Sequence, residues 1–269
     1  MITTFKNIKH TSSLSISSVH DYNNSIYNFS REDKNIVLNL YLEESVKNIN
    51  LEDISFFSSL IEGEITKEQF IESQLKFSHA VMYYSRPLAI CIANIPNAVQ
   101  RMPVVGNLWE EHGKGNKNDI HENKIITLIS RLGGNVNNIN KDNKSINVLI
   151  FNQLLRGVSS FEDYRFSVAM FAAIERLFVD ISSCICNAIK SNNWLEADRI
   201  THYELHKEID IIHAEELLKV VEKEYQKAEG KLLVQQGVKF GLEIFINLYV
   251  GLYKEIKEKK SHRGDELLG

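Results

Sequence analysis

The sequence contains little proline, and its few prolines lie close together. Only three of the 269 residues are proline, at Pro87, Pro96 and Pro103. Because proline interrupts helices, a long chain that is almost free of it elsewhere is predicted to be helical from end to end. Alternating strand patterns, hairpin signals and repeats of fixed length are also missing, which argues against β and repeat architectures.

Cysteine, long apolar runs and excess positive charge are scarce as well. The three cysteines, Cys91, Cys184 and Cys186, are an odd number within apolar segments, which indicates buried thiols of a reducing compartment and not disulfides. No apolar run approaches the roughly 18 residues of a membrane span, and the N-terminal residues lack the apolar core of a secretory signal. The net charge of −4 does not indicate a nucleic-acid-binding protein, because such proteins concentrate lysine and arginine. We therefore expect a cytoplasmic protein that binds neither membranes nor nucleic acid.

The remaining composition, 43% hydrophobic and 25% charged, is typical of a globular protein. Thr66 and Gln69 form a capping box at the start of a long helical pattern, which Pro87 is expected to kink or divide. The sequence predicts a flexible polar segment at 1–30 and a single all-α domain at 31–260, with seven or eight helices. Helical periodicity occurs at about 33–47, 66–95, 104–111, 121–132, 145–157, 161–190, 195–226 and 231–260.

The most informative motif is formed by His206, Asp210 and His213. Their spacing of i, i+4 and i+7 brings the three side chains within about 60° of one another on a helix. Imidazole and carboxylate groups are ligands of divalent iron, manganese and zinc, and helix bundles build dinuclear sites from such residues. The alternatives are a satisfied polar network in the core or a solvated helix face. Apolar neighbours indicate that the arc points at least partly into the core.

Further metal ligands would have to come from other helices. Glu175 stands alone in an apolar run, and the adjacent Arg176 points about 100° away around the helix. A second candidate region contains Glu110 and Glu111, followed by a glycine-broken stretch and then His121. Ideal helix geometry favours Glu110 as the partner of His121, but the glycines break the helix, so geometry alone does not decide between the two glutamates.

Together these residues resemble the haem-oxygenase-like diiron oxidases and oxygenases, which have the haem-oxygenase/TenA-like helical bundle. The family pattern is Glu and His on the first core helix, Glu on the second, and His-x3-Asp-x2-His on the third. The resemblance covers about residues 67–220, and its spacing favours Glu111 over Glu110. It implies six metal ligands, namely Glu111, His121, Glu175, His206, Asp210 and His213.

The resemblance also implies a reaction. Two Fe(II) ions and O2 as co-substrate would serve a non-haem oxidase or oxygenase acting on a small amino acid, amine or fatty-acid-like substrate. Three carboxylates offset most of the +4 charge of two ferrous ions. Members that oxygenate amine nitrogen usually carry an extra carboxylate ligand on the preceding helix, but the segment 77–90 contains no acidic residue. Oxidative C–C cleavage, decarboxylation or desaturation is therefore favoured. From their positions, Trp109, Phe171 and Phe178 are expected to form an apolar wall.

Three other interpretations remain. Some relatives make 4-aminobenzoate by consuming their own tyrosine and a lysine near the second-helix Glu. In this sequence the residue ten positions after Glu175 is Ile185, so that route lacks an obvious lysine. TenA-like hydrolases use a catalytic cysteine, whose activation needs a neighbour that lowers its pKa, and no His adjoins Cys184 or Cys186 in the sequence. The third is a partner-binding protein with structural metals. For the synthesis of 4-aminobenzoate, the tyrosines that could be consumed are Tyr27, Tyr41, Tyr83 and Tyr84.

The sequence indicates little about how the protein binds its substrate or a second subunit. Four arginines could each pair with a substrate carboxylate or form a surface salt bridge: Arg86, Arg101, Arg156 and Arg165. The apolar last helix could serve a homodimer interface, through Phe240, Phe245, Leu248, Tyr249 and Leu252.

Overall fold

The computed structural model describes residues 33–139 and 144–265. Within these residues the chain forms nine α-helices and no strand, which confirms the all-α prediction. The ninth helix is a short one, Ser55–Ile61, which the periodicity analysis missed because seven residues make only two turns. The predicted segment at 1–30 lies outside the described residues.

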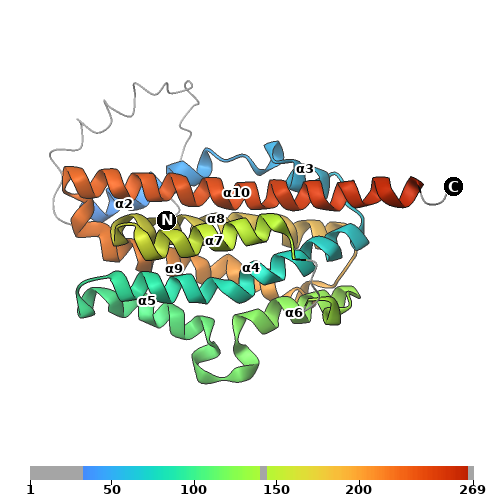
Figure 1. Ribbon diagram of the computed structural model, residues 1–269, viewed down its shortest axis with the longest axis horizontal. Coiled ribbons are helices and arrows are strands. Elements are labelled where there is room, and N and C mark those ends of the chain that lie inside the picture. The colour runs from blue at the N-terminus through green and yellow to red at the C-terminus, as the bar shows by residue number, and fades with distance from the viewer. Residues whose placement is uncertain (1–32, 140–143, 266–269) are drawn as a thin grey trace, which may run out of the picture.

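The helices form one bundle around a common core (Figure 1). Helix α8 packs most extensively against α9 and α10, α4 packs against α7 and α6, and α5 packs against α9. No helix among the described residues is long and apolar enough to cross a membrane. In chain order the helices are α2 (Asp33–Lys47), α3 (Ser55–Ile61), α4 (Lys67–Asn94), α5 (Ala98–Glu111), α6 (His121–Leu132), α7 (Ile146–Phe161), α8 (Tyr164–Ser191), α9 (Thr201–Tyr225) and α10 (Ala228–Asp265).

Helix α4 shows what local sequence signals do and do not decide. The capping box is formed: the Gln69 backbone N–H donates to the Thr66 hydroxyl, and the Thr66 N–H donates to the Gln69 side chain. Pro87, however, does not divide the helix, which continues to Asn94. Burial of Ala80 and Leu88 on either side of Pro87 holds the helix together despite the missing N–H.

The start of α5 also differs from the sequence prediction. We expected a helix from about Val104, after Pro103, but α5 begins at Ala98. The Asn97 side chain caps it by accepting from the backbone N–H groups of Val99 and Gln100. Pro103 lies in the second turn of the helix, where it removes a single backbone N–H donor, and the helix continues through it.

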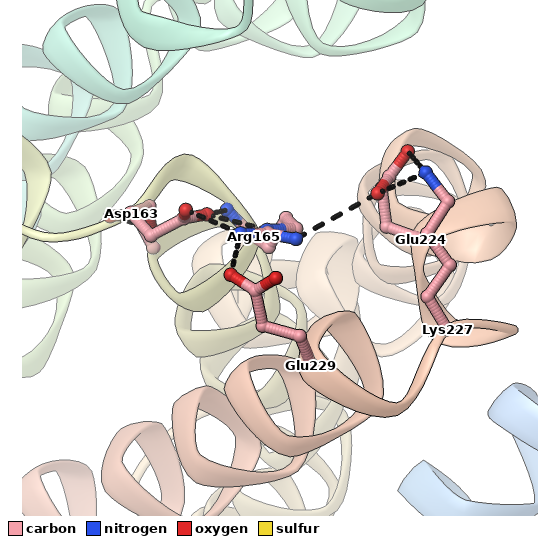
Figure 2. Close-up of polar contacts among 6 residues, drawn as sticks. Asp163, Arg165, Glu224, Lys227 and Glu229 are labelled. Atoms are coloured by element: carbon pink, nitrogen blue, oxygen red, sulfur yellow. Dashed lines mark hydrogen bonds and ion pairs between the residues drawn. The ribbon is translucent and has the colours of Figure 1, made fainter.

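An ion-pair network fixes the start of α8 against the turn between α9 and α10 (Figure 2). Asp163 accepts hydrogen bonds from the backbone and the guanidinium of Arg165, at 2.8–2.9 Å. The guanidinium also contacts Glu229 at 3.1 Å and Glu224 at 3.8 Å. Arg165 is thus held by three carboxylates and does not line the cavity described below.

Helix α10 contributes mainly to the core of its own chain. Phe245, Leu248, Tyr249 and Leu252 are all buried within the bundle. The sequence analysis named these four side chains and Phe240 as residues that could serve a homodimer interface. The four are instead packed within the core of their own chain, and Phe240 is partly buried against it. A homodimer stays a prediction without a defined interface.

The close packing of α10 on α8 depends on Gly241. A Cβ atom at this position would lie 2.4 Å from the carbonyl oxygen of Met170, which is closer than real Cβ contacts allow. We expect Gly241→Ala to lower the free energy of unfolding by about 1–3 kcal/mol, because the two helices must separate. The measurement is denaturant unfolding followed by circular dichroism.

Gly157→Ala is the matched control, since Gly157 lies in helix α7 and a Cβ there would meet nothing within 4 Å. This change should raise stability by about 0.5–1 kcal/mol, from helix propensity alone. Equal effects of the two substitutions would contradict the close approach of α8 and α10.

Candidate metal centre

The inward face of α9 is polar. His202, His206, Asp210 and His213 are buried, whereas Ile212, between two of them, is 56% exposed. This reverses the usual preference for burying isoleucine ahead of charged and imidazole groups. Since burying such groups costs free energy unless they are paired, the face indicates a function other than packing.

Three of the predicted ligands meet in one cluster between α8 and α9. Nδ1 of His213 lies 3.9 Å from Glu175 Oε2 and 3.8 Å from Asp210 Oδ1. One ligand atom from each residue lies within 4.8 Å of the others, and all three side chains are buried. Atoms that bind one metal ion at about 2.0–2.2 Å are about 3–4 Å apart, and the two distances from His213 fall within this range.

A second pair joins the end of α5 to the start of α6. His121 Nδ1 lies 2.9 Å from Glu111 Oε1, but the two atoms are not aligned for a hydrogen bond. The connection between these helices is the loop at the bottom of Figure 1, beyond which α6 continues in the same general direction as α5. The loop leaves the bundle and returns to it, so that Glu111 at the end of α5 and His121 at the start of α6 lie together. Gly113 permits the close approach of the two ends of this loop: its φ is +64°, and a Cβ would lie 2.7 Å from the backbone of Asp119 and Ile120.

His206 connects the pair to the cluster. Its Nδ1 lies 2.8 Å from Asp210 Oδ1, and its ring centre lies 5.3 Å from that of His121. Nε2 of His206 is buried without a hydrogen-bond partner, as is Nδ1 of His213. The structure therefore brings all six predicted ligands to one buried region, although only Glu175, Asp210 and His213 form a compact three-residue group.

Glu110 and Glu111 both reach this region, from different sides. Glu111 is buried beside His121, as described above. Glu110 lies at the rim, where its side chain is 26% exposed and accepts from Lys114, and its Oε2 is 3.2 Å from His213 Nε2. The sequence analysis treated the two glutamates as alternatives, whereas the structure gives each a different histidine.

Tyr84 of α4 orients the central carboxylate. Its hydroxyl donates a 2.8 Å hydrogen bond to Glu175 Oε1, while Oε2 faces His213. Burial and the charge of Glu175 hold the pKa of Tyr84 well above its usual value, so the phenol keeps its proton and remains a donor. The sequence analysis considered Tyr84 only as a tyrosine that the protein could consume, because its contact with Glu175 depends on helix packing.

The electrostatics of the site reflect crowded, buried negative charge. Burial and the charge of Glu175 raise the pKa of Asp210 well above its ordinary value. Burial raises the pKa of Glu111 as well, but His121, His206 and His213 together outweigh it and leave a net lowering. Burial lowers the pKa of His213, yet the carboxylates of Glu175, Asp210 and Glu111 bring it to about 10.

The charge and the donor atoms of these side chains suit the binding of divalent cations. Three buried carboxylates lie close together, and the positive groups that act on Asp210 are histidines. Buried carboxylates need paired charge, which divalent cations would supply. Nε2 of His206 and Nδ1 of His213 are buried without a hydrogen-bond partner, and each would bind a metal ion, with His213 releasing its proton as the ion binds. The donor set of carboxylate oxygen and imidazole nitrogen is one that iron accepts.

A cavity adjoins this centre. Its polar lining is Tyr84, Glu111, His121, Glu175, His202 and His206. Its apolar lining comes from α4, α7, α8 and α10, through Phe77, Ala80, Val81, Phe151, Ile174, Phe178 and Phe245.

Two of the three expected wall residues are placed differently. Phe178 lines the cavity, but Phe171 lies behind it with its ring edge against Tyr84. The expectation for Trp109 is wrong, since this side chain is 55% exposed. Trp109 shares α5 with Glu111 but points to another side of that helix.

Sequence reasoning also missed His202, which lines the cavity one helical turn before His206. Burial, together with the neighbouring His206 and His121, holds its pKa well below the usual value. A signal for it was present, because His202, His206 and Asp210 continue the same spacing of four residues along α9.

The cysteines do not contribute a nucleophile to the cavity. None of the three is among its lining residues. Burial raises the pKa of Cys91 and Cys186 to about 12 and that of Cys184 to about 11. Thiols of this kind are not activated for catalysis.

Solved structures share this fold at low sequence identity. A domain of unknown function with a haem oxygenase-like fold from Shewanella denitrificans is 14% identical, with a TM-score of 0.68 over 93% of this chain and 97% of that one. A TenA homologue from Pseudomonas syringae is 10% identical, with a TM-score of 0.60 over 74% and 84%. A TenA family transcription regulator from a Silicibacter species is 11% identical, with a TM-score of 0.56 over 85% and 99%. These similarities establish the haem-oxygenase/TenA-like bundle, and the fold alone.

The sequence comparison is more specific. No curated protein matches this sequence significantly. Residues 74–245, however, match a family described as iron-containing redox enzymes, and this range includes all six predicted metal ligands. The matched range is more than half of the chain. This protein therefore belongs to the family of iron-containing redox enzymes.

Proposed function

We propose that this protein is a non-haem diiron oxidase or oxygenase that uses O2 to oxidise a small molecule. The observation that carries the proposal is the convergence of three carboxylates and three imidazoles, from α5, α6, α8 and α9, in one buried region beside a largely apolar cavity. Membership of an iron-containing redox family supports iron as the metal. The ligands we propose are Glu111, His121, Glu175, His206, Asp210 and His213.

Each part of the chain has a distinct task in this proposal. When bound, two ferrous ions would supply electrons for the reduction of O2. The six ligands would hold these ions, and Glu175 has a central place among the ligands because its Oε2 faces His213. Tyr84 keeps one Glu175 oxygen fixed through its hydrogen bond, so the other oxygen stays directed toward His213. The phenylalanines around the cavity exclude water from the reacting centre.

The lining favours a substrate with an apolar body. No lysine or arginine is among the described residues that line the cavity, so a substrate carboxylate would have no cationic side chain there to pair with. The α4 wall carries Phe77, Ala80, Val81 and Tyr84, and none of them is acidic. An extra carboxylate ligand from α4 is therefore missing among the described lining residues, which supports C–C cleavage, decarboxylation or desaturation over N-oxygenation. The apolar body of a fatty-acid-like molecule, an amino acid or an amine fits this lining, and the polar end of such a substrate would have to lie at the metal centre.

The alternatives have less support. The route to 4-aminobenzoate needs a lysine beside the site, and none of the described cavity residues is lysine. Of its candidate tyrosines only Tyr84 lines the cavity, while Tyr27 lies outside the described residues. A partner-binding protein with structural metals would have no need for an apolar cavity beside them. We propose a small-molecule substrate and no nucleic-acid or membrane partner.

Oxygen consumption tests the reaction. Protein loaded anaerobically with Fe(II) should take up O2 in the presence of a medium-chain fatty acid, an apolar amino acid or an apolar amine. The Zn(II)-loaded protein is the control, because zinc has no redox chemistry. An oxygen electrode and mass spectrometry of the products provide the measurement. Iron-loaded protein that consumes no O2 with any substrate of this panel would contradict the oxidase proposal.

Metal stoichiometry tests the ligand set. The wild-type chain should bind about two Fe(II) ions, as expected for a dinuclear bundle site. His213→Ala should lose at least one, because no other imidazole lies on that part of α9. His79→Ala, which removes a half-buried histidine outside the cavity, should retain both. Iron analysis after gel filtration measures the difference, and a full complement in His213→Ala would refute this ligand.

The two adjacent glutamates should behave differently. Glu111→Ala is expected to lose iron because it removes the buried partner of His121. Glu110→Ala should keep near-normal stoichiometry, because Glu110 is at the rim and is already paired with Lys114. The same iron analysis applies. The reverse pattern would mean that Glu110 is the ligand and that Glu111 only neutralises His121.

A further inference from the structure

His202 is the most isolated polar side chain around the cavity. It lies on α9 one turn before His206 and is fully buried. Neither of its ring nitrogens has a hydrogen-bond partner. Its ring packs against Tyr203 and Phe178, with centres 4.9 and 6.0 Å away, and neither contact satisfies a nitrogen. A buried imidazole without any partner is costly, so the chain keeps His202 for something that the protein atoms alone do not supply.

Three imidazoles share this side of the cavity. The ring centre of His206 lies 4.7 Å from that of His202 and 5.3 Å from that of His121. An imidazole bound to a metal at about 2.0–2.1 Å has its ring centre about 3.2 Å from the ion. Two such rings at angles of about 90–110° are then about 4.5–5.2 Å apart. The spacings of His206 from His202 and from His121 are close to those of neighbouring imidazoles bound to one ion.

We propose that His202 is a seventh ligand, which completes a metal position with Glu111, His121 and His206. This inference rests on the proposed diiron function, and it makes the two metal positions unequal. The position with His202 would have three imidazoles and one carboxylate. The other, formed by Glu175, Asp210 and His213, is rich in carboxylate, although Glu175 can bridge the two.

The inequality has a chemical consequence. Imidazole suits iron, zinc and copper, whereas carboxylate oxygen suits harder ions such as manganese. The position completed by His202 should therefore hold its ion more tightly than the carboxylate-rich position when softer divalent metals are supplied. A hydrogen bond from His202 to substrate is the competing role for this residue, and it predicts no change in metal binding.

The test is a metal titration of His202→Phe. Phenylalanine keeps an aromatic ring against Phe178 and Tyr203 but removes both nitrogens. Metal-free wild type and variant are titrated anaerobically with Co(II), whose visible absorption reports its ligands, and then with Fe(II). We expect one of the two positions to bind at least about tenfold more weakly in the variant, with a changed Co(II) spectrum at that position. The second position should bind as in wild type.

Two further variants keep the result interpretable. His79→Phe makes the same substitution outside the cavity and should titrate like wild type. His202→Gln retains a side-chain oxygen that can bind a metal ion weakly. Its metal affinity should therefore lie between that of wild type and that of His202→Phe. It also provides the measurement if the phenylalanine variant does not fold, as judged by thermal unfolding of the metal-free proteins.

The outcomes separate this inference from the proposed function. Wild-type protein that binds no Co(II) or Fe(II) would contradict the diiron function itself. Wild type that binds two ions, together with unchanged affinity and spectrum in His202→Phe, would overturn only the role of His202. A raised KM in His202→Phe with unchanged metal binding would also overturn the role of His202 as a metal ligand. It would indicate that His202 binds the substrate instead.

Discussion

The burial of three carboxylates in the middle of a helix bundle is the constraint on which the rest of this structure depends. Glu111, Glu175 and Asp210 are all buried. An unpaired buried ion costs several kcal/mol, a large fraction of a typical domain stability of about 5–15 kcal/mol. Positive charge must therefore be supplied locally. The histidines of α6 and α9 provide part of it, and the two divalent ions of the proposed centre would provide the rest.

The proposed centre is assembled from parts of the chain that are far apart in sequence. Helix α9 supplies His206, Asp210 and His213, α8 supplies Glu175, and the turn after α5 brings two more ligands together. Tyr84 of α4 adds a hydrogen bond to the central carboxylate. Because five helices contribute, the geometry of the site depends on how closely the bundle packs as a whole.

The cavity beside the centre limits the chemistry more than the fold does. The haem-oxygenase/TenA-like bundle is shared with TenA homologues, and a fold by itself does not define a reaction. The difference lies in the side chains. The cysteines have raised pKa values and do not line the cavity, whereas carboxylates and imidazoles do. Phenylalanines, Ala80, Val81 and Ile174 form the apolar part of the lining, as the proposed apolar substrate would require.

The sequence by itself determined the helical class, the capping box at Thr66 and the inward face of α9, because periodicity and capping depend on residues only a few positions apart. Membership of the superfamily also followed from the sequence motif, and the family match agrees with it. Only the tertiary structure decided that α4 continues through Pro87, that Trp109 is exposed, and that His202 joins the cavity lining. These features depend on which helices pack together and at what distance, and local sequence patterns carry no record of that.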